Sequence, residues 1–287
     1  MGQRTRNGIF DRAAPTYRKL GPDHFGYFAE LLVDRVGITS GADILDVGTG
    51  TGAVLAAVGS RWRGRGRLVG IDRSAAMLAR ARRELRGLEV QLFEMDAQEL
   101  DLPHGSFDVV LCSFGLQNFS SRERALLSFV RVMRPGGRLG LVYPRGWHFL
   151  YDVRWLWQAD LFREFGADIG MVETDAAGLN QLVEHAGFER VRIEEVPYQL
   201  AFRDEEEWWS WSWSHGTRAL FEAIPTARIE ALRQELARGL RERCMGADGL
   251  IHGSLSAFVI TAVSMSDDLA EVECASPVDD MPSHVRS

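Results

Sequence analysis

The sequence predicts an α/β fold, a doubly wound and mostly parallel sheet with helices on both faces. Three observations predict it. From Ala42 onward, short apolar runs alternate with helical patterns, which is typical of parallel sheets wrapped by helices. A glycine-rich turn follows the first apolar run. Finally, Asp46, Asp72 and Asp96 close three successive strands, at the edge where open α/β sheets bind ligands.

The first half of the chain supplies the regular part of this alternation. Ser74 is placed to cap a helix, since its hydroxyl can accept from the first amides. Pro135 ends another helix, because the residue before proline disfavours helical geometry. We expect strands at 42–47, 67–72, 90–96, 107–113 and 138–143. We expect one helix that follows the glycine-rich turn and ends at residue 60, and two more at 74–86 and 122–133.

The second half is less regular after Tyr143. Gly187 is placed to end one helix, and Pro225 interrupts a long helical region. In that region Ile229, Leu232, Leu236 and Leu240 lie along one face. We expect helices at 147–165, 175–186 and 204–243, strands at 191–200 and 253–263, and a disordered tail at 265–287.

Composition narrows the function classes. The 287 residues carry a net charge of −7, which argues against a nucleic-acid substrate. No apolar run is long enough for a membrane span, and the first residues lack the core of a secretory signal. The three cysteines are scattered, so we expect free thiols, no metal site and a cytoplasmic protein.

The glycine-rich turn reads Asp46-Val-Gly48-Thr49-Gly50-Thr-Gly52. Its glycines let the backbone turn tightly and approach a ligand. Their spacing is G-x-G-x-G, whereas NAD-binding turns use G-x-G-x-x-G. The acid two residues before the first glycine would repel a pyrophosphate and suits a cation. S-adenosylmethionine, which carries a sulfonium and an ammonium but no phosphate, fits this pattern.

Two further acids fit the same ligand. Asp72 ends the second strand, where a carboxylate can accept from both ribose hydroxyls. Asp96, followed by Ala97, ends the third, where it can accept from the adenine amino group. Acidic residues also end strands because they form turns, and for a single acid this structural explanation would be as good as a ligand-binding one. Three in register behind DVGTGTG favour the nucleotide site.

Between Ile44 and Tyr143 the chain resembles class I methyltransferases, and within them the ubiquinone/menaquinone C-methyltransferase family. The resemblance is carried by SFGLQN at 113–118, VMRPGGR at 132–138 and FDRAAPTY at 10–17. It implies a Rossmann-like sheet of seven strands with the last antiparallel, and it implies that Phe10 and Tyr17 lie over the cofactor. After Tyr143 the chain reads PRGWH, where that family's quinone methylators have an acidic, serine-containing segment.

We therefore divide the chain into a helical lid at 1–40, a cofactor-binding core at 41–145, cap helices with the remaining core elements at 146–264, and the tail. S-adenosylmethionine is the expected cofactor and S-adenosylhomocysteine its product. We assign to cofactor binding Asp46, Gly48, Thr49, Gly50, Gly52, Asp72, Arg73, Met77, Asp96, Ala97, Ser113 and Tyr17. We assign to substrate binding Phe10, Phe114, Gln117, Asn118, Trp147 and Trp211.

The cap is rich in tryptophan. Seven of the eight tryptophans lie between Trp147 and Trp213, where they either line an apolar pocket or only pack the cap onto the sheet. A base is needed only if the acceptor must lose a proton. His215, His148 and Tyr17 are the candidates, and the alternative for each histidine is a structural hydrogen bond.

The sequence thus favours methyl transfer to a small hydrophobic metabolite in bacterial secondary metabolism. Three alternatives stay open: a quinone C-methyltransferase, a cyclase on terpenoid or polyketide substrates that couples to methylation or merely binds the cofactor, and a non-catalytic regulator that binds S-adenosylmethionine. The acceptor atom and any homo-oligomer also stay open.

Overall fold

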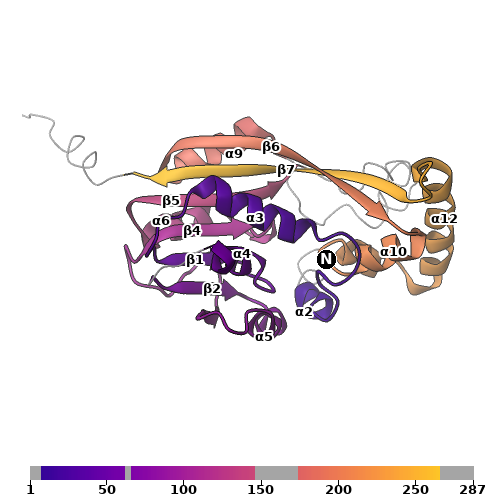
Figure 1. The fold of residues 1–287 in the computed structure, drawn as a ribbon, viewed down its shortest axis with the longest axis horizontal. Coiled ribbons are helices and arrows are strands. Elements are labelled where there is room, and N and C mark those ends of the chain that lie inside the picture. The colour runs from indigo at the N-terminus through magenta and orange to yellow at the C-terminus, as the bar shows by residue number, and fades with distance from the viewer. Residues whose placement is uncertain (1–7, 62–65, 146–173, 266–287) are drawn as a thin grey trace, which may run out of the picture.

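The structure is a computed structural model and describes residues 8–61, 66–145 and 174–265. Its centre is a seven-stranded sheet of order β3-β2-β1-β4-β5-β7-β6 (Figure 1). β7 runs antiparallel to both of its neighbours, while β1 to β5 pair in parallel. The predicted fold class is therefore confirmed. The strands are β1 Ile44–Val47, β2 Leu68–Asp72, β3 Gln91–Glu94, β4 Phe107–Ser113, β5 Met133–Pro144, β6 Phe188–Phe202 and β7 Ile251–Ser264.

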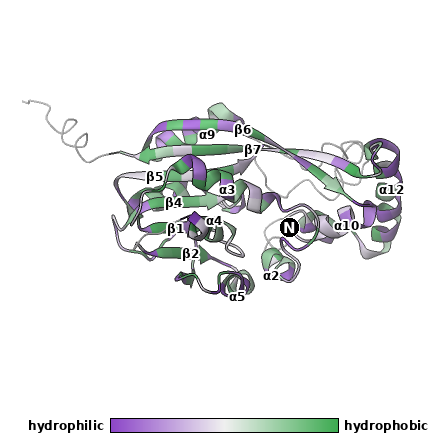
Figure 2. Cartoon of the chain, viewed as in Figure 1, coloured by the Kyte–Doolittle hydropathy of each residue, from purple (hydrophilic) through white to green (hydrophobic). Residues whose placement is uncertain are grey.

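Helices cover both faces of the sheet, because successive strand side chains point to opposite faces. In β4, Val109 and Leu111 enter the core beneath one layer, whereas Val110 and Cys112 enter the core beneath the other. Figure 2 shows the strands as largely hydrophobic between these layers. The first layer comprises α3 His24–Val36, α4 Ala53–Arg61 and α5 Ala75–Glu84; the second comprises α6 Arg122–Val132 and α9 Ala176–His185.

Most element boundaries follow the predicted ones, and β4 matches at both ends. Ser74 caps α5 as expected, its hydroxyl accepting from the Met77 amide. The main correction concerns Met133, which was expected to end a helix. It lies in extended backbone and pairs with Phe107, so β5 begins five residues earlier than the residue-138 start expected from its apolar run.

The predicted lid segment divides between two structural roles. α3 packs on the sheet, with Phe28, Leu32 and Val36 buried in the first core. The part that lies beside the ligand edge is the short helix α2, Ile9–Ala13, and the turn that follows it.

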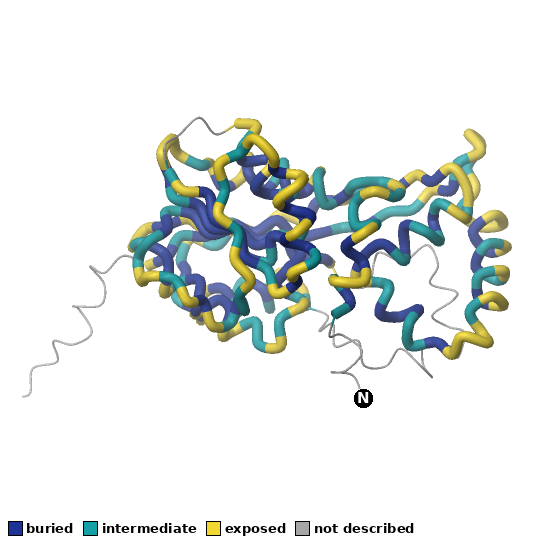
Figure 3. Tube along the Cα trace, turned by 90° about the horizontal axis from the view of Figure 1, so that it is seen from below, coloured by how far each residue is buried: buried dark blue, intermediate teal, exposed yellow. Residues whose placement is uncertain are grey.

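The cap stands on a two-stranded ribbon. β5 pairs with β7 only as far as Ala257, whereas β6 and β7 continue to pair out to Phe202 and Ile251. The end of this ribbon carries α10 Glu205–Trp213, α11 Arg218–Ala223 and α12 Thr226–Cys244 (Figure 1). Figure 3 shows the buried trace continuing from the sheet into this smaller body. The expected apolar face of α12 is confirmed, since Leu232, Leu236 and Leu240 are buried.

The helical region expected at 204–243 breaks twice, at Pro225 and also at 214–217. The second break was not expected. There the carbonyl of Trp211 accepts from the Ser214 amide, the Ser214 hydroxyl and the His215 ring. Side chains that hydrogen-bond nearby backbone compete with helix continuation.

Some expectations fall outside the described residues. They are the helix at 147–165 with Trp147 and His148, and the tail from 266 onward. Among the described helices, none combines the length and apolar character that crossing a membrane requires.

Candidate active site

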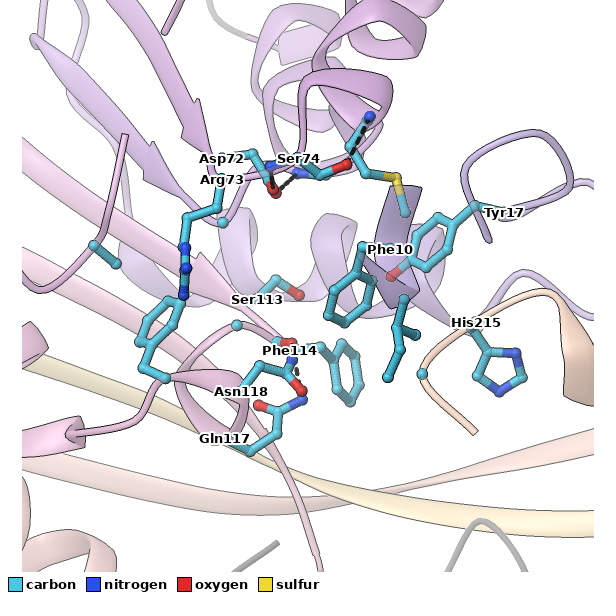
Figure 4. Close-up of a pocket in the computed structure, with 18 of the residues that line it drawn as sticks. Phe10, Tyr17, Asp72, Arg73, Ser74, Ser113, Phe114, Gln117, Asn118 and His215 are labelled. Atoms are coloured by element: carbon cyan, nitrogen blue, oxygen red, sulfur yellow. Dashed lines mark hydrogen bonds between the residues drawn. The ribbon is translucent and has the colours of Figure 1, made fainter. Parts of the chain in front are cut away.

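A cavity of about 480 Å³ opens where β1, β2 and β4 end. Such a volume is typical of small-molecule sites, and the carboxyl edge of an open α/β sheet is their usual place. Figure 4 shows Asp72, Arg73 and Ser74 on one side of this pocket and His215 on the opposite side, with Phe10, Ser113 and Phe114 between them.

The glycine-rich turn forms one wall of the pocket. Gly48 and Gly50 line it, and Gly48 has a φ of 70°, which favours glycine. Thr49 and Gly52 do not line it. The Thr49 hydroxyl instead donates to Asp46, and a Cβ on Gly52 would lie 2.7 Å from the Leu85 side chain. These two residues therefore shape the turn.

Asp46 lies next to the pocket and is only 1% exposed. Its Oδ2 accepts from the Thr49 hydroxyl at 2.6 Å, while its Oδ1 has no hydrogen-bond partner among the described residues. Burial, assisted by the Asp72 charge, raises the pKa of Asp46 to about 7. A buried carboxylate oxygen in this position fits a ligand that brings a positive charge or an N–H donor.

Asp72 lines the pocket and is held from two sides. Its Oδ2 accepts from the Gly50 amide and its Oδ1 from the Ser74 amide, both at 2.9 Å (Figure 4). Burial raises the pKa of Asp72, although these amide hydrogen bonds oppose the rise. Each carboxylate oxygen keeps a further lone pair, so the fixed carboxylate can accept from neighbouring ligand hydroxyls. Arg73 and Met77 line the same part of the pocket.

The third predicted acid lies differently. Ala97 and Met95 line the pocket, whereas Asp96 between them does not. Asp96 accepts from the amide and the side-chain nitrogen of Gln98 at 2.9 and 3.1 Å. Burial alone would raise the pKa of Asp96, but these hydrogen bonds outweigh that effect and hold it below its usual value.

Aromatic rings from the N-terminal segment cover the pocket. Tyr17 stacks on Phe25 with ring centroids 5.0 Å apart and meets the edge of Phe10 at 6.5 Å. Burial and the nearby Asp72 charge raise the pKa of Tyr17, so its phenol is neutral. The structure thus brings Phe10 and Tyr17 together at the pocket.

The end of β4 and the segment after it supply the pocket wall between the sheet edge and the cap. Ser113, Phe114, Gln117 and Asn118 all line the pocket. The side-chain amides of Gln117 and Asn118 both donate to the Phe114 carbonyl oxygen, at 2.8 and 3.0 Å. Phe114 has a φ of 53°, a conformation that bulky residues rarely adopt. Such backbone strain clusters at functional sites.

His215 reaches the pocket from the cap. Its Nδ1 lies 2.7 Å from the carbonyl oxygen of Trp211. A carbonyl can only accept, so Nδ1 carries the proton and Nε2 carries the lone pair. Burial lowers the pKa of His215 to about 4, although the hydrogen bond to Trp211 opposes it. At neutral pH the ring is therefore an uncharged imidazole.

Trp211 occupies a different position from the expected one. It is 2% exposed and does not line the pocket. Its indole packs where a Cβ on Gly21 would lie, and its Nε1 donates to the Pro22 carbonyl oxygen at 3.2 Å. The Trp211 side chain thus lies outside the pocket lining. Trp211 contributes to the site through its backbone carbonyl oxygen, which accepts from His215 and orients that ring.

Several lining residues were missed by sequence reasoning. They are brought in by the fold: Ile9, Asp11, Phe25, Met95, Phe119, Thr217 and Ala219. Asp11 lies in the FDRAAPTY stretch directly after the predicted Phe10, and that position is a signal that could have found it. Phe25 lies in an amphipathic helix, whose pattern does not reveal which ring leaves the core.

Comparisons with known proteins agree with this geometry. A family model described as a methyltransferase domain matches residues 44–137. The chain is 31% identical over 257 residues to nocamycin O-methyltransferase of Saccharothrix syringae, with 83% of this chain and 91% of that protein covered. It is 48% identical over 98 residues to demethylmenaquinone methyltransferase of Thermus thermophilus, with 33% and 44% covered.

Among solved structures, the chain is similar to phosphoethanolamine N-methyltransferase 2 of Haemonchus contortus in complex with S-adenosylhomocysteine. The TM-score is 0.56 at 18% identity, and the match covers 92% of this chain and 58% of that one. This likeness concerns the fold.

Proposed function

The chain belongs to the class I S-adenosylmethionine-dependent methyltransferases, and we propose that it methylates a hydroxyl oxygen of a small, largely apolar metabolite in bacterial secondary metabolism. S-adenosylmethionine is the cofactor of this class, and the residues at the sheet edge suit it. The bound cofactor supplies a methyl group already activated by its sulfonium.

The cofactor half of the pocket matches the parts of that molecule. Asp72 would accept from the ribose hydroxyls, and the apolar side chains of Met77 and Ala97 would flank the adenine. Gly48 and Gly50 let the amino-acid part approach the backbone. The buried Oδ1 of Asp46, with no partner among the described residues, suits the positive charge of this ligand.

One observation carries the proposal: the same cavity is lined by this sheet edge and by rings from the lid and cap. On the lid and cap side the described lining residues include Phe10, Phe25 and Ala219. Apart from Asp11, which accepts from Ser74, they carry no side chain ionised at neutral pH. Such walls favour a neutral, largely apolar acceptor, since an unpaired charge there would be costly.

The state of His215 favours oxygen as the acceptor atom. With Nδ1 donating to Trp211, Nε2 can accept a hydrogen bond from a hydroxyl, orient it and receive its proton. A carboxylate acceptor would meet a lone pair instead of a donor. Because burial makes His215 a weak base, with a pKa of about 4, acidic hydroxyls such as phenols and enols suit it better than alkyl alcohols.

The pattern of relatives supports oxygen over carbon. The match to the O-methyltransferase extends over 83% of this chain, far more than the cofactor-binding core alone. The match to the demethylmenaquinone methyltransferase covers 33% of this chain. The O-methyltransferase alternative therefore has support over more of the chain than the quinone alternative.

The test uses S-adenosylmethionine with a trideuterated methyl group and a panel of neutral fused-ring phenols, enols, matched alcohols, carboxylic acids and a demethylmenaquinol. We expect a trideuteromethyl ether on at least one phenol or enol, located by mass and proton–carbon NMR. A labelled carbon on the quinol would favour the C-methyltransferase instead. Isomerisation without label would favour a cyclase, and cofactor binding with no turnover on the whole panel would favour a regulator.

A further inference from the structure

Arg80 is a buried arginine that the proposed reaction does not use. It lies on α5, the helix whose first turn brings Ser74 and Met77 to the pocket, and it is 4% exposed. An arginine is rarely buried to this degree unless its guanidinium is paired. Its position raises the question of what the guanidinium holds.

The guanidinium binds backbone of the N-terminal segment. Its Nη1 donates to the carbonyl oxygens of Ala14 and Tyr17, at 2.7 and 2.6 Å. Its Nη2 donates to Oε1 of Glu84 at 2.7 Å, one turn further along α5. The hydrogen bonds and charge of Arg80 correspondingly hold the pKa of Glu84 below its usual value.

The two carbonyls belong to the turn that places Tyr17. Ala14 is the C-cap of α2, where carbonyls lack partners within the helix and attract a positive charge. Tyr17 follows three residues later and presents its ring to the pocket (Figure 4). This ring stacks on Phe25. By holding a carbonyl at each end of this turn, Arg80 fixes the backbone from which the ring projects.

Other contacts, from α5 and from the cap, hold the same segment. The Ser74 hydroxyl donates to Asp11 at 2.5 Å, which attaches α2 to the start of α5. Arg12 forms an ion pair with Glu222 of α11 at 2.5 Å, which attaches α2 to the cap. The Arg12 pair is bidentate and is 43% and 20% exposed, and Arg218 of α11 adds an exposed hydrogen bond to the Arg12 carbonyl oxygen. Among these arginine contacts, the one made by Arg80 is the buried one.

We propose that Arg80 is a positioning residue: it holds segment 9–17 closed over the bound cofactor through the carbonyls of Ala14 and Tyr17. The inference rests on the proposed function in that this pocket binds S-adenosylmethionine. Arg80 acts through the backbone of the segment and touches no reacting atom.

The test compares Arg80→Met, Arg80→Lys and the control Arg83→Met on the exposed face of the same helix. The methionine keeps the apolar stem and removes every donor, whereas lysine keeps the charge without the planar fork. Calorimetry should show S-adenosylmethionine affinity about tenfold or more weaker in Arg80→Met, with part of the loss recovered in Arg80→Lys. Arg83→Met should bind as the wild type does.

Hydrogen exchange separates positioning from general damage. In Arg80→Met the amides of Ala14 and Tyr17, which donate to Phe10 and Ala13, should exchange faster while those of β4 stay protected. Wild-type affinity together with wild-type exchange would overturn the proposal. If Arg80→Met also loses amide protection in β4, the Arg80→Lys variant is the deciding one. Wild-type affinity and wild-type exchange in Arg80→Lys would then overturn the proposal.

The failure of the proposed function would look different. If the wild-type protein binds no S-adenosylmethionine, the cofactor assignment fails, and exchange in the ligand-free protein still tests the hold of Arg80 on the segment. If binding depends on Arg80 but no acceptor is methylated, the positioning role stands and the methyl-transfer proposal fails.

Discussion

Nδ1 of His215 lies 2.7 Å from the carbonyl oxygen of Trp211, and this contact assigns the proton to Nδ1 and the lone pair to Nε2. The Thr217 hydroxyl oxygen lies 3.5 Å from Nε2, and we propose that this nitrogen offers a hydrogen-bond acceptor to the substrate. The proposed chemistry depends on this assignment, because a hydroxyl needs an acceptor for its proton while the methyl group is transferred.

Replacing His215 by Ala should lower turnover by about a hundredfold or more and leave S-adenosylmethionine affinity within about threefold of the wild type. The control is His252→Ala, since His252 is exposed on β7 and pairs with Asp248. Steady-state kinetics at saturating cofactor measure the effect. Turnover of His215→Ala within a few-fold of wild type would remove the base from the mechanism.

Turnover should increase with pH as His215 loses its proton. A base must be neutral to act, and burial lowers the pKa of His215 to about 4. Turnover at saturating cofactor should therefore rise with pH through about 4 and be flat between pH 6 and 8. A step in turnover between pH 6 and 7 that His215→Ala abolishes would contradict the low pKa.

Cofactor affinity should depend on pH through Asp46, whose pKa burial raises to about 7. A cationic ligand favours the ionised carboxylate, so the ligand-free protein must release a proton below that pH. We expect the dissociation constant of the wild type for S-adenosylmethionine to be about tenfold larger at pH 6 than at pH 8. Asp46→Asn should remove this slope, and calorimetry in two buffers counts the released protons. Equal slopes in the two proteins would exclude Asp46 as the titrating group.

Asp72→Ala should weaken S-adenosylmethionine binding by about 1–3 kcal/mol, because the ribose hydroxyls lose a charged acceptor. The matched control is Glu94→Ala, since Glu94 pairs with Asp72 in the neighbouring strand but is exposed and does not line the pocket. Calorimetry measures both variants. Loss of binding in the control alone would place the ribose elsewhere.

Substitutions of Trp211 test whether its backbone carbonyl positions the His215 ring. Trp211→Ala should reduce the free energy of unfolding by about 3–5 kcal/mol, since it empties a buried site beside Gly21. Trp211→Phe should cost less and still lower turnover about tenfold, because the carbonyl that orients His215 shifts. Chemical denaturation and kinetics measure the two effects. Trp209→Phe, on a half-buried ring packed against Phe221, is the control. A stable Trp211→Phe variant with wild-type turnover would show that the carbonyl's position tolerates the change.

The cofactor half of this account could be predicted from sequence because its determinants are local. The turn that begins at Asp46 and the acid at Asp72 each lie where a strand ends, so spacing alone places them at one edge. β4 was predicted at both ends because its apolar residues, Phe107 and 109–112, lie between turn-forming segments.

The acceptor half depends on contacts between segments far apart in the chain. Whether Trp211 faces the pocket is decided by Gly21 and Pro22, about 190 residues earlier, and no spacing rule connects them. Arg80 reads as an exposed residue in an arginine-rich helix until Ala14 and Tyr17 are folded against it. Sequence patterns give the face of a helix, but they do not give the partner of that face.

The most direct test of the central claim is an experimental structure with S-adenosylhomocysteine bound. If His215 accepts the proton of a hydroxyl in line with the breaking bond, the cofactor sulfur should face His215 and lie about 6–8 Å from its Nε2, the span of one methyl group and one oxygen. The ribose should lie against Asp72 in the same structure. A sulfur that faces away from His215, or that lies beyond reach of a single intervening oxygen, would contradict hydroxyl methylation with His215 as the base.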